Sequence, residues 1–198
     1  MLTFKIDGRW EPEDFIALLS GVESLYYKAT ISGRYYPFYE EALAFGQTLN
    51  GLSYEDRLAA GNAYLLQAAR FTVSADRRLY VTRIQYASPG GVDVAGLGAV
   101  AEALYKSLQL LLTFIQERRL RQEGDKQAKI ETEIKGESLR AIQIENAEKL
   151  LRLRREFPDD IVGFLLPLAV EDQRKLTSLM LEGKLVGVEY TKTEDSTS

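Results

Sequence analysis

The chain has 198 residues, of which 45% are hydrophobic and 27% charged, a size and composition typical of one globular domain. It contains no cysteine and no histidine, which excludes disulfides, thiolate nucleophiles, metal sites built on these residues and the most common general base. The formal net charge of −4 argues against a basic surface that recruits nucleic acid. We therefore predict no cofactor and do not expect a nucleic acid partner.

The first part of the chain predicts one strand and three helices. Apolar and polar residues alternate over residues 2–7 before Gly8, which indicates a half-buried strand. Pro12 then opens an apolar pattern of helical spacing that reaches about Thr30. Two further helices are expected over residues 40–49 and 53–71, the second with Ser53 as its N-cap.

A second alternating run, residues 79–87, predicts another strand, and a sharp break follows it. We expect the break to be a turn or hinge that leads directly from this strand into an apolar helix over residues 94–115. In this interpretation Asp93 is the N-cap of the helix. The predicted hinge consists of Pro89, Gly90, Gly91 and Asp93.

The glycine-rich segment 88–98 also suggests a nucleotide-binding site. A glycine-rich turn between a strand and a helix presents backbone N–H groups to phosphates. The segment lacks a Gly-Lys-Ser/Thr sequence, however, and Asp93 places a negative charge where a phosphate would bind. A nucleotide-binding sensor is therefore an alternative, and a structural turn is the preferred interpretation.

The apolar segment 94–115 is long enough to raise the question of a membrane, because about 20 apolar residues span a bilayer. Glu102, Lys106 and Gln109 interrupt it on neighbouring turns, and charges at mid-bilayer are costly. We therefore favour a helix buried in the core or in an oligomer. A peripheral membrane or pore-forming effector is the alternative that uses the same helix.

From residue 117 to 157 the chain becomes strongly charged with mixed signs, as in a solvated, coiled-coil-like helical arm. Gly124 leaves two arrangements of residues 94–157 open, one continuous helix or an antiparallel hairpin. Apolar residues form an intermittent stripe along this segment, and Asn146 lies in the same stripe. A polar residue at such a position can fix the register in which two helices pack. The predicted oligomer interface consists of Leu104, Leu108, Leu111, Leu112, Ile115, Leu139, Ile142, Leu150 and Leu153.

The C-terminal part predicts a helix and a last strand. Residues 162–168 are apolar but contain Gly163 and Pro167, so the helix is expected only from about Val170 to Glu182. A third alternating run over residues 184–190 predicts a strand. Residues 191–198 are polar and are expected to form a flexible tail.

The segment from Leu79 to Phe157 resembles a widespread group of bacterial proteins. The shared pattern is a strand, a Ser-Pro turn followed by an acidic residue, an apolar helix and a charged coiled coil. In this chain the pattern corresponds to Leu-Tyr-Val-Thr-Arg-Ile-Gln-Tyr-Ala-Ser-Pro-Gly-Gly-Val-Asp and the later Ile-Glu-Asn-Ala. The resemblance implies a bacterial origin and no particular activity, cofactor or catalytic residue.

These patterns predict an α+β fold in which about three strands form a small sheet packed on helices. The body would comprise residues 1–116 and 158–190, with residues 117–157 as the arm. Paired acids such as Asp159-Asp160 lie at expected helix starts, where acids are common anyway, so no pattern indicates an enzyme. We predict a cytoplasmic, non-enzymatic oligomerising or scaffold module of a bacterial multiprotein system, one related to defence, that forms homo-oligomers or binds a protein partner.

Overall fold

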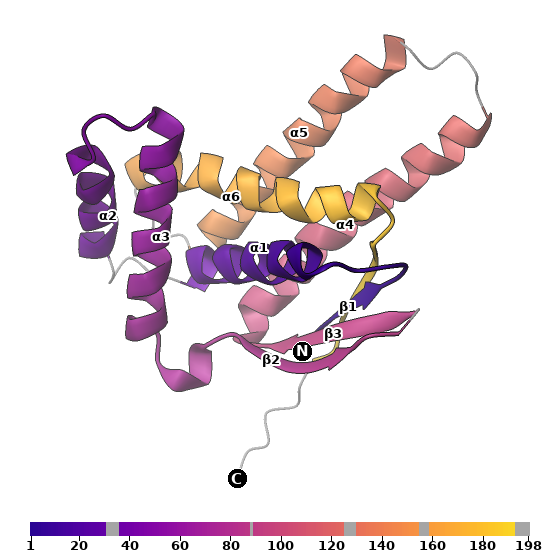
Figure 1. The fold of residues 1–198 in the computed structure, drawn as a ribbon, viewed down its shortest axis with the longest axis horizontal. Helices are drawn as coiled ribbons and strands as arrows, with labels where there is room; N and C mark the ends of the chain where they lie inside the picture. The colour runs from indigo at the N-terminus through magenta and orange to yellow at the C-terminus, as the bar shows by residue number, and fades with distance from the viewer. Residues whose placement is uncertain (31–35, 88, 125–129, 155–158, 193–198) are drawn as a thin grey trace.

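The computed structural model (Figure 1) describes residues 1–30, 36–87, 89–124, 130–154 and 159–192. Within these residues it contains six α-helices and one four-stranded antiparallel sheet, so the predicted α+β class is confirmed. The helices are α1 (Pro12–Thr30), α2 (Tyr36–Thr48), α3 (Tyr54–Thr72), α4 (Gly98–Gly124), α5 (Ile130–Leu151) and α6 (Asp159–Leu181). The strands are β1 (Leu2–Ile6), β2 (Tyr80–Gln85), β3 (Gly90–Ala95) and β4 (Leu185–Tyr190), in the spatial order β2-β3-β1-β4.

The sheet buries one face against the helices, as the alternation of β1 predicts. Leu2, Phe4 and Ile6 are 0% exposed, whereas Lys5 points to the opposite, solvated face. On that outer face Lys5 forms an ion pair with Glu189 of β4. The three predicted strands are therefore confirmed as members of one sheet, and β1 lies at its centre between β3 and β4.

The sheet has a fourth strand, β3, where a strand-to-helix turn was expected. Gly90, Gly91 and Asp93 lie within β3, and Pro89 lies in the connection that joins β2 to β3 as a β-hairpin. The predicted hinge that launches a helix is therefore wrong. The helix α4 starts later, at Gly98, so Val94 belongs to the sheet.

The hairpin forms because residues 90–95 fit both faces of the sheet. Val92 and Val94 are buried on the helix side and pair with Phe4 and Leu2 of β1. Asp93 points to the other face, where one of its carboxylate oxygens accepts a 2.8 Å hydrogen bond from Arg83 Nε of β2. The acid therefore pairs across strands and does not cap a helix.

Gly90 is required by the tight connection between β2 and β3. A Cβ at this position would lie 2.5 Å from the carbonyl oxygens of Gln85 and Ala87. Only glycine therefore allows the chain to turn back so closely on itself. Gly90, the first residue of β3, is therefore selected by the space that the returning chain leaves.

Helix α1 links the sheet to the remaining helices. Its N-terminus is capped by Asp14, whose carboxylate accepts a 2.8 Å hydrogen bond from the Glu11 N–H. Near its C-terminal end, the Tyr26 hydroxyl donates to the Arg77 carbonyl oxygen and accepts from the Leu97 N–H, each at 2.6 Å. The helix is therefore fixed to the segments that precede β2 and follow β3.

Helix α6 is longer than the sequence predicts, because it continues through Pro167. The proline ring removes one backbone hydrogen bond and crowds the carbonyl of residue 163. Both Gly163 and Pro167 are exposed, and nothing lies within 4 Å of a Cβ built on Gly163. The carbonyl of Gly163, which loses its hydrogen bond to the proline, therefore faces solvent. On the opposite side of the helix Leu165 is 0% exposed and packs in the core.

Helices α4 and α5 form an antiparallel hairpin, which decides between the two arrangements left open by the sequence. The Asn146 amide of α5 donates a 3.1 Å hydrogen bond to the Ser107 carbonyl oxygen of α4. Asn146, Ala147 and Leu150 are buried, so the second half of α5 packs in the core. A separate helical arm is not clearly shown, and the division of the chain at residue 117 stays a prediction.

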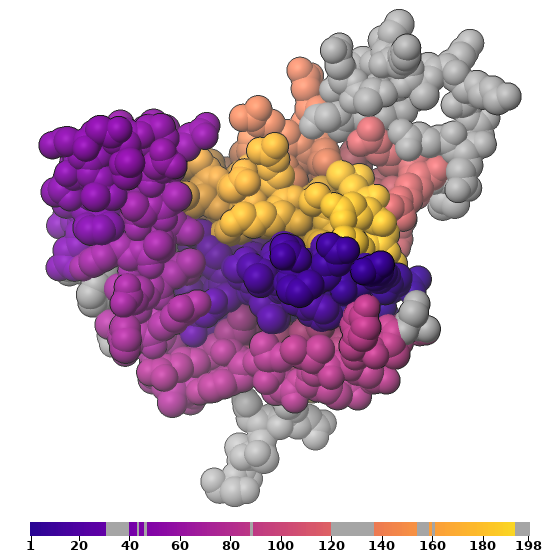
Figure 2. Space-filling view, viewed as in Figure 1, coloured from indigo at the N-terminus to yellow at the C-terminus, as the bar shows by residue number. Residues whose placement is uncertain are grey.

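Helices α2 and α3 form a second helical hairpin, which stands at one end of the molecule (Figures 1 and 2). The two helices approach closely where Gly61 of α3 lies against Ala42 of α2. Arg70 ties α3 to α1 through two hydrogen bonds to the Glu23 carboxylate, at 2.8 and 2.6 Å.

The first and last strands of the chain lie side by side in the sheet. The Thr191 N–H donates a 2.9 Å hydrogen bond to the Met1 carbonyl oxygen, next to the paired strands β1 and β4. Of the predicted flexible tail 191–198, residues 193–198 lie outside the described residues.

Candidate functional site

Three buried polar side chains form a closed cluster between α1 and α6. The Lys28 ammonium lies 2.5 Å from a carboxylate oxygen of Asp172 and 2.6 Å from the Ser24 hydroxyl oxygen. The Ser24 hydroxyl donates to the same carboxylate oxygen at 2.6 Å. Ser24, Lys28 and Asp172 are only 2%, 1% and 3% exposed.

This cluster has the residue types of a serine nucleophile with a lysine base, but it lacks access for a substrate. Burial lowers the pKa of Lys28, while the charge of Asp172 opposes this shift by stabilising the ammonium. A lysine acts as a base only in its neutral form. The surface grooves of 910, 460 and 290 Å³ along α4, α5 and α6 are not lined by Ser24, Lys28 or Asp172. We therefore assign the cluster a structural role, which joins α1 to α6.

The residues predicted to form an oligomer interface divide into a buried set and an accessible set. The accessible set lies on α5 and at its end: Leu139 and Ile142 are half-buried, and Leu153 is 39% exposed. The buried set, at most 4% exposed, packs inside this chain and consists of Leu104, Leu108, Leu111, Leu112, Ile115 and Leu150. Only the accessible residues are in a position to meet another molecule without unfolding.

A second apolar face of α4 and α5 remains uncovered, and we call it the outer α4/α5 face. It holds two adjoining grooves of 460 and 290 Å³, which share Lys106 and Leu110. Ile142 lines the first groove and Leu153 the second. Leu110 is 49% exposed although it is a leucine in the middle of a long helix. Helix α4 is thus apolar on two sides, one of which is covered by its own chain.

The α4 part of this face is a stripe with opposite charges at its ends. Lys106, Leu110, Phe114 and Glu117 follow one another at spacings of four, four and three residues, so they lie on one side of the helix. We call these four residues the α4 stripe. Its two apolar side chains are central, with the positive charge on the N-terminal side and the negative charge on the C-terminal side.

The charged rim residues of the outer α4/α5 face also form pairs within the chain. The Lys106 ammonium lies 2.6 Å from Glu102, and this hydrogen bond lowers the pKa of Glu102. Lys149 of α5 lies 2.5 Å from Glu145. Exposed pairs one helical turn apart contribute little to stability, so the two lysines can exchange partners at little cost.

Buried polar side chains join α5 to its neighbours α4 and α6. The Asn146–Ser107 hydrogen bond is 4–6% exposed at its two residues, and Gln143 donates a 3.0 Å bond to the Thr177 hydroxyl of α6. Asn146 is the residue that the apolar stripe of the sequence singled out as a register position, whereas Ser107, Gln143 and Thr177 were not predicted. Buried polar pairs fix the relative register of helices, because a shifted helix leaves them unsatisfied.

The glycine-rich segment 88–98 does not have the geometry expected of a phosphate-binding loop. Its residues 90–95 form strand β3, and Asp93 is 4% exposed and paired with Arg83. The N–H groups that would face a phosphate are instead committed to the sheet, where β3 pairs with both β1 and β2. Elsewhere in the described part of the chain, no cluster of three or more acidic side chains is placed to hold a metal ion.

One helical segment in the described part of the chain, Gly98–Arg119, has the length and apolar composition to cross a membrane. In the fold, 44% of its most apolar stretch is buried. The core leucines of α4, among them Leu104 and Leu108, account for that part of its apolar character. The accessible remainder is the outer face with Leu110 at its centre.

Comparison with known proteins adds no family to these observations. No protein-family pattern, curated protein or solved structure matches the chain.

Proposed function

We propose that this protein is a non-enzymatic oligomerising module of the cytoplasm, whose copies associate through the outer α4/α5 face and so serve as a scaffold for other proteins. The observation that carries the proposal is the α4 stripe, in which Leu110, 49% exposed, and the half-buried Phe114 lie between Lys106 and Glu117. Exposed apolar residues that gather between charged ends are typical of protein interfaces.

The stripe is complementary to a second copy of itself. When two α4 helices cross antiparallel about a two-fold axis near Leu110 and Phe114, the Lys106 end of one copy faces the Glu117 end of the other. The central apolar side chains then bury one another, while the charges select the antiparallel orientation. The same geometry supports the prediction that Ile142 and Leu153 belong to an interface, since both line the adjoining grooves.

The first test measures the mass of the protein in solution. We expect a dimer or higher oligomer in sedimentation equilibrium at micromolar concentration. Leu110→Glu places a charge in the centre of the interface and should weaken self-association at least tenfold, because burying an unpaired carboxylate costs several kcal/mol. Ile16→Glu is the matched control, since Ile16 is 65% exposed on α1 and should leave the mass unchanged.

A charge exchange tests the orientation. Lys106→Glu and Glu117→Lys should each weaken the oligomer by like-charge contact, and the double variant should restore it. A monomeric wild-type protein at these concentrations would overturn the proposal.

The competing use of the same face is contact with a membrane, which is favoured by the length and apolar composition of Gly98–Arg119. Flotation with neutral and anionic vesicles separates the two functions. An oligomeric protein that stays at the bottom of the gradient supports the scaffold, whereas flotation that Leu110→Glu abolishes would assign the face to lipid.

A further inference from the structure

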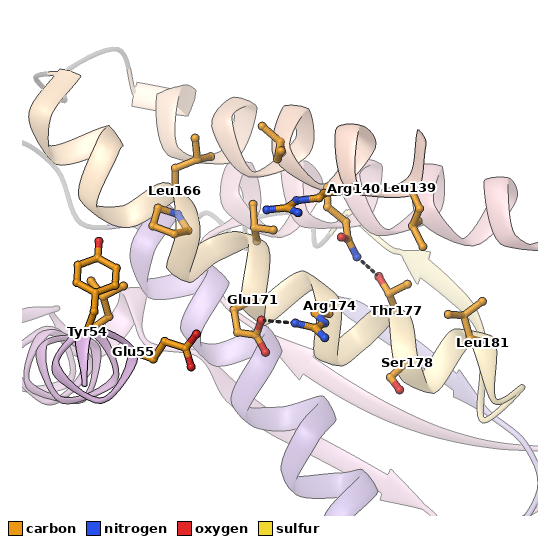
Figure 3. Close-up of a pocket in the computed structure, with 15 residues that line it drawn as sticks. Tyr54, Glu55, Leu139, Arg140, Leu166, Glu171, Arg174, Thr177, Ser178 and Leu181 are labelled. Atoms are coloured by element: carbon orange, nitrogen blue, oxygen red, sulfur yellow. Dashed lines mark hydrogen bonds and ion pairs between the residues drawn. The ribbon is translucent and has the colours of Figure 1, made fainter. Parts of the chain in front are cut away.

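A long open groove runs between α5 and α6 on a different side of the helices from the α4 stripe, and the N-terminal turn of α3 closes one end (Figure 3). Its volume is 910 Å³, which falls in the range of sites that bind a ligand or a segment of a partner. The groove shares no residue with the two grooves of α4.

The floor of the groove is apolar and in part exposed. Leu166 and Val170 lie one turn apart on α6 and are half-buried, and Ile144 of α5 is 38% exposed beside them. Leu181 at the far end of α6 is 45% exposed, and Tyr54 at the α3 end is 65% exposed. Five apolar side chains from three helices thus converge on one groove.

The length of the groove fits a helix of about four turns. Leu166 and Leu181 are both lining residues, and the 15 residues between them correspond to about 22 Å along the axis of α6. The walls are helices, whose backbone hydrogen bonds are satisfied internally, so they give an extended peptide no strand edge to pair with. An apolar groove of this kind receives side chains at spacings of three and four residues, which an amphipathic helix supplies.

Two side chains at the edge of the groove carry charges that are not paired within the described residues. Arg140 lies on the α5 wall and Glu55 lies at the α3 end, and both are exposed (Figure 3). The other two charged lining residues, Glu171 and Arg174, pair with each other at 3.4 Å. The groove therefore presents one positive and one negative charge at different points along its length.

We propose that this groove binds an amphipathic α-helix of a partner protein. The apolar face of that helix packs on Val170 and Ile144. An acidic residue faces Arg140, and a basic residue that follows it in the helix faces Glu55. An acid before a base is also the order that stabilises the helix itself, through its macrodipole and through pairs one turn apart. The bound helix then runs antiparallel to α6.

The test uses two fluorescein-labelled helical peptides of about 16 residues. Both carry leucines at positions i, i+4, i+7 and i+11. In the first peptide a glutamate precedes a lysine on the flank of the apolar face, and in the second the two are exchanged. Fluorescence anisotropy should show saturable binding of the first peptide to the full chain, with about fivefold preference over the second, as expected for two exposed ion pairs.

Variants assign the binding to the groove. The double variant Arg140→Glu with Glu55→Lys should invert the preference between the peptides, and both positions are exposed, so the fold should not change. Ile144→Glu should weaken both peptides at least tenfold. Leu110→Glu, on the α4 stripe, should leave both affinities as in the wild type and thus separates this proposal from the oligomer interface.

Equal affinity for both peptides, or no saturable binding, would overturn the proposal. Loss of self-association in the Arg140→Glu/Glu55→Lys variant would also overturn it, because the occupant would then be a second copy of this chain.

Discussion

Burial of a single ammonium group explains the polar contacts between α1 and α6. Lys28 is 1% exposed, and its Nζ atom has Asp172 and Ser24 within 2.6 Å. A buried charge is tolerated only when it is paired and hydrogen-bonded. The ion pair with Asp172 therefore joins the last turns of α1 to α6.

Asp172→Asn should strongly destabilise the fold, because it removes the negative charge and leaves the Lys28 ammonium buried. We expect a loss of roughly 3–5 kcal/mol in the free energy of unfolding, the range for breaking a buried pair on one side. Urea unfolding followed by circular dichroism measures it.

The control is Glu171→Gln, which removes the neighbouring exposed acid and should change the free energy of unfolding by less than about 0.5 kcal/mol. The double variant Lys28→Met with Asp172→Leu removes both charges and should recover most of the stability. A loss below about 1 kcal/mol in Asp172→Asn would mean that Lys28 is neutral in the fold.

At the scale of elements, the sequence predicted correctly those helices and strands whose own periodicity of apolar residues indicates their secondary structure. The strand β1, the helix α1 and the helix α3 agree with the expected ranges within a few residues. Strand β3 was missed because its two valines are flanked by glycines and Asp93, a composition that resembles a loop when Arg83 of the neighbouring strand is unknown. The full extent of α6 was missed because tertiary burial of Leu165 overrides Pro167.

Helices α2 and α3 approach each other closely at Gly61. A Cβ there would lie 3.0 Å from the Ala42 carbonyl oxygen and 3.5 Å from the ring of Phe164. Gly61→Leu should therefore push the α2–α3 hairpin apart, with a loss of about 1–3 kcal/mol for an overpacked contact.

Hydrogen exchange measures this effect locally. The amides of α2 and α3 should exchange faster in Gly61→Leu, while those of β1 and α4 should not change. Ala63→Leu, at an exposed position of the same helix, is the matched control and should leave the amide protection of all helices as in the wild type. Unchanged protection in α2 would show that the two helices can separate without loss.

At the scale of the whole molecule, the candidate surfaces arise from how the helices are shared between core and solvent. The sequence predicted an apolar helix over residues 94–115 and an intermittent apolar stripe in the charged segment after it, but it did not reveal which side of each helix the chain covers itself. Leu104 and Leu110 look equivalent in the sequence, yet one is 0% and the other 49% exposed. The α5–α6 groove was not predicted at all, because its residues come from three separate segments and only the fold brings them together.

The N-terminus of α1 is tied to the turn before β4 by an ion pair that joins the two ends of the chain. The Lys184 ammonium lies 2.7 Å from Asp14 Oδ1. Burial tends to raise the pKa of Asp14, but the Glu11 N–H and Lys184 outweigh it, so the pKa is lowered. The hydrogen bonds to Asp14 and Glu182 raise the pKa of Lys184.

These shifts give the stability a defined pH dependence. Asp14, with its lowered pKa, contributes stability above the unfolded value of about 3.9 and loses it as the pH falls through the folded pKa. Lys184, with its raised pKa, contributes stability below about pH 10.4 and loses it as the pH rises through the folded pKa. The ion pair therefore stabilises the fold most between these limits.

Lys184→Met should accordingly be more destabilising at about pH 7 than at an acidic pH below the folded pKa of Asp14, where this carboxyl is protonated in both proteins. Urea unfolding of the wild type and the variant at the two pH values measures the difference. Lys149→Met is the control, because it removes an exposed pair within one helix and should show a small effect at both pH values. A Lys184→Met effect of equal size at both pH values would mean that the Lys184 side chain acts through packing and not through its charge on Asp14.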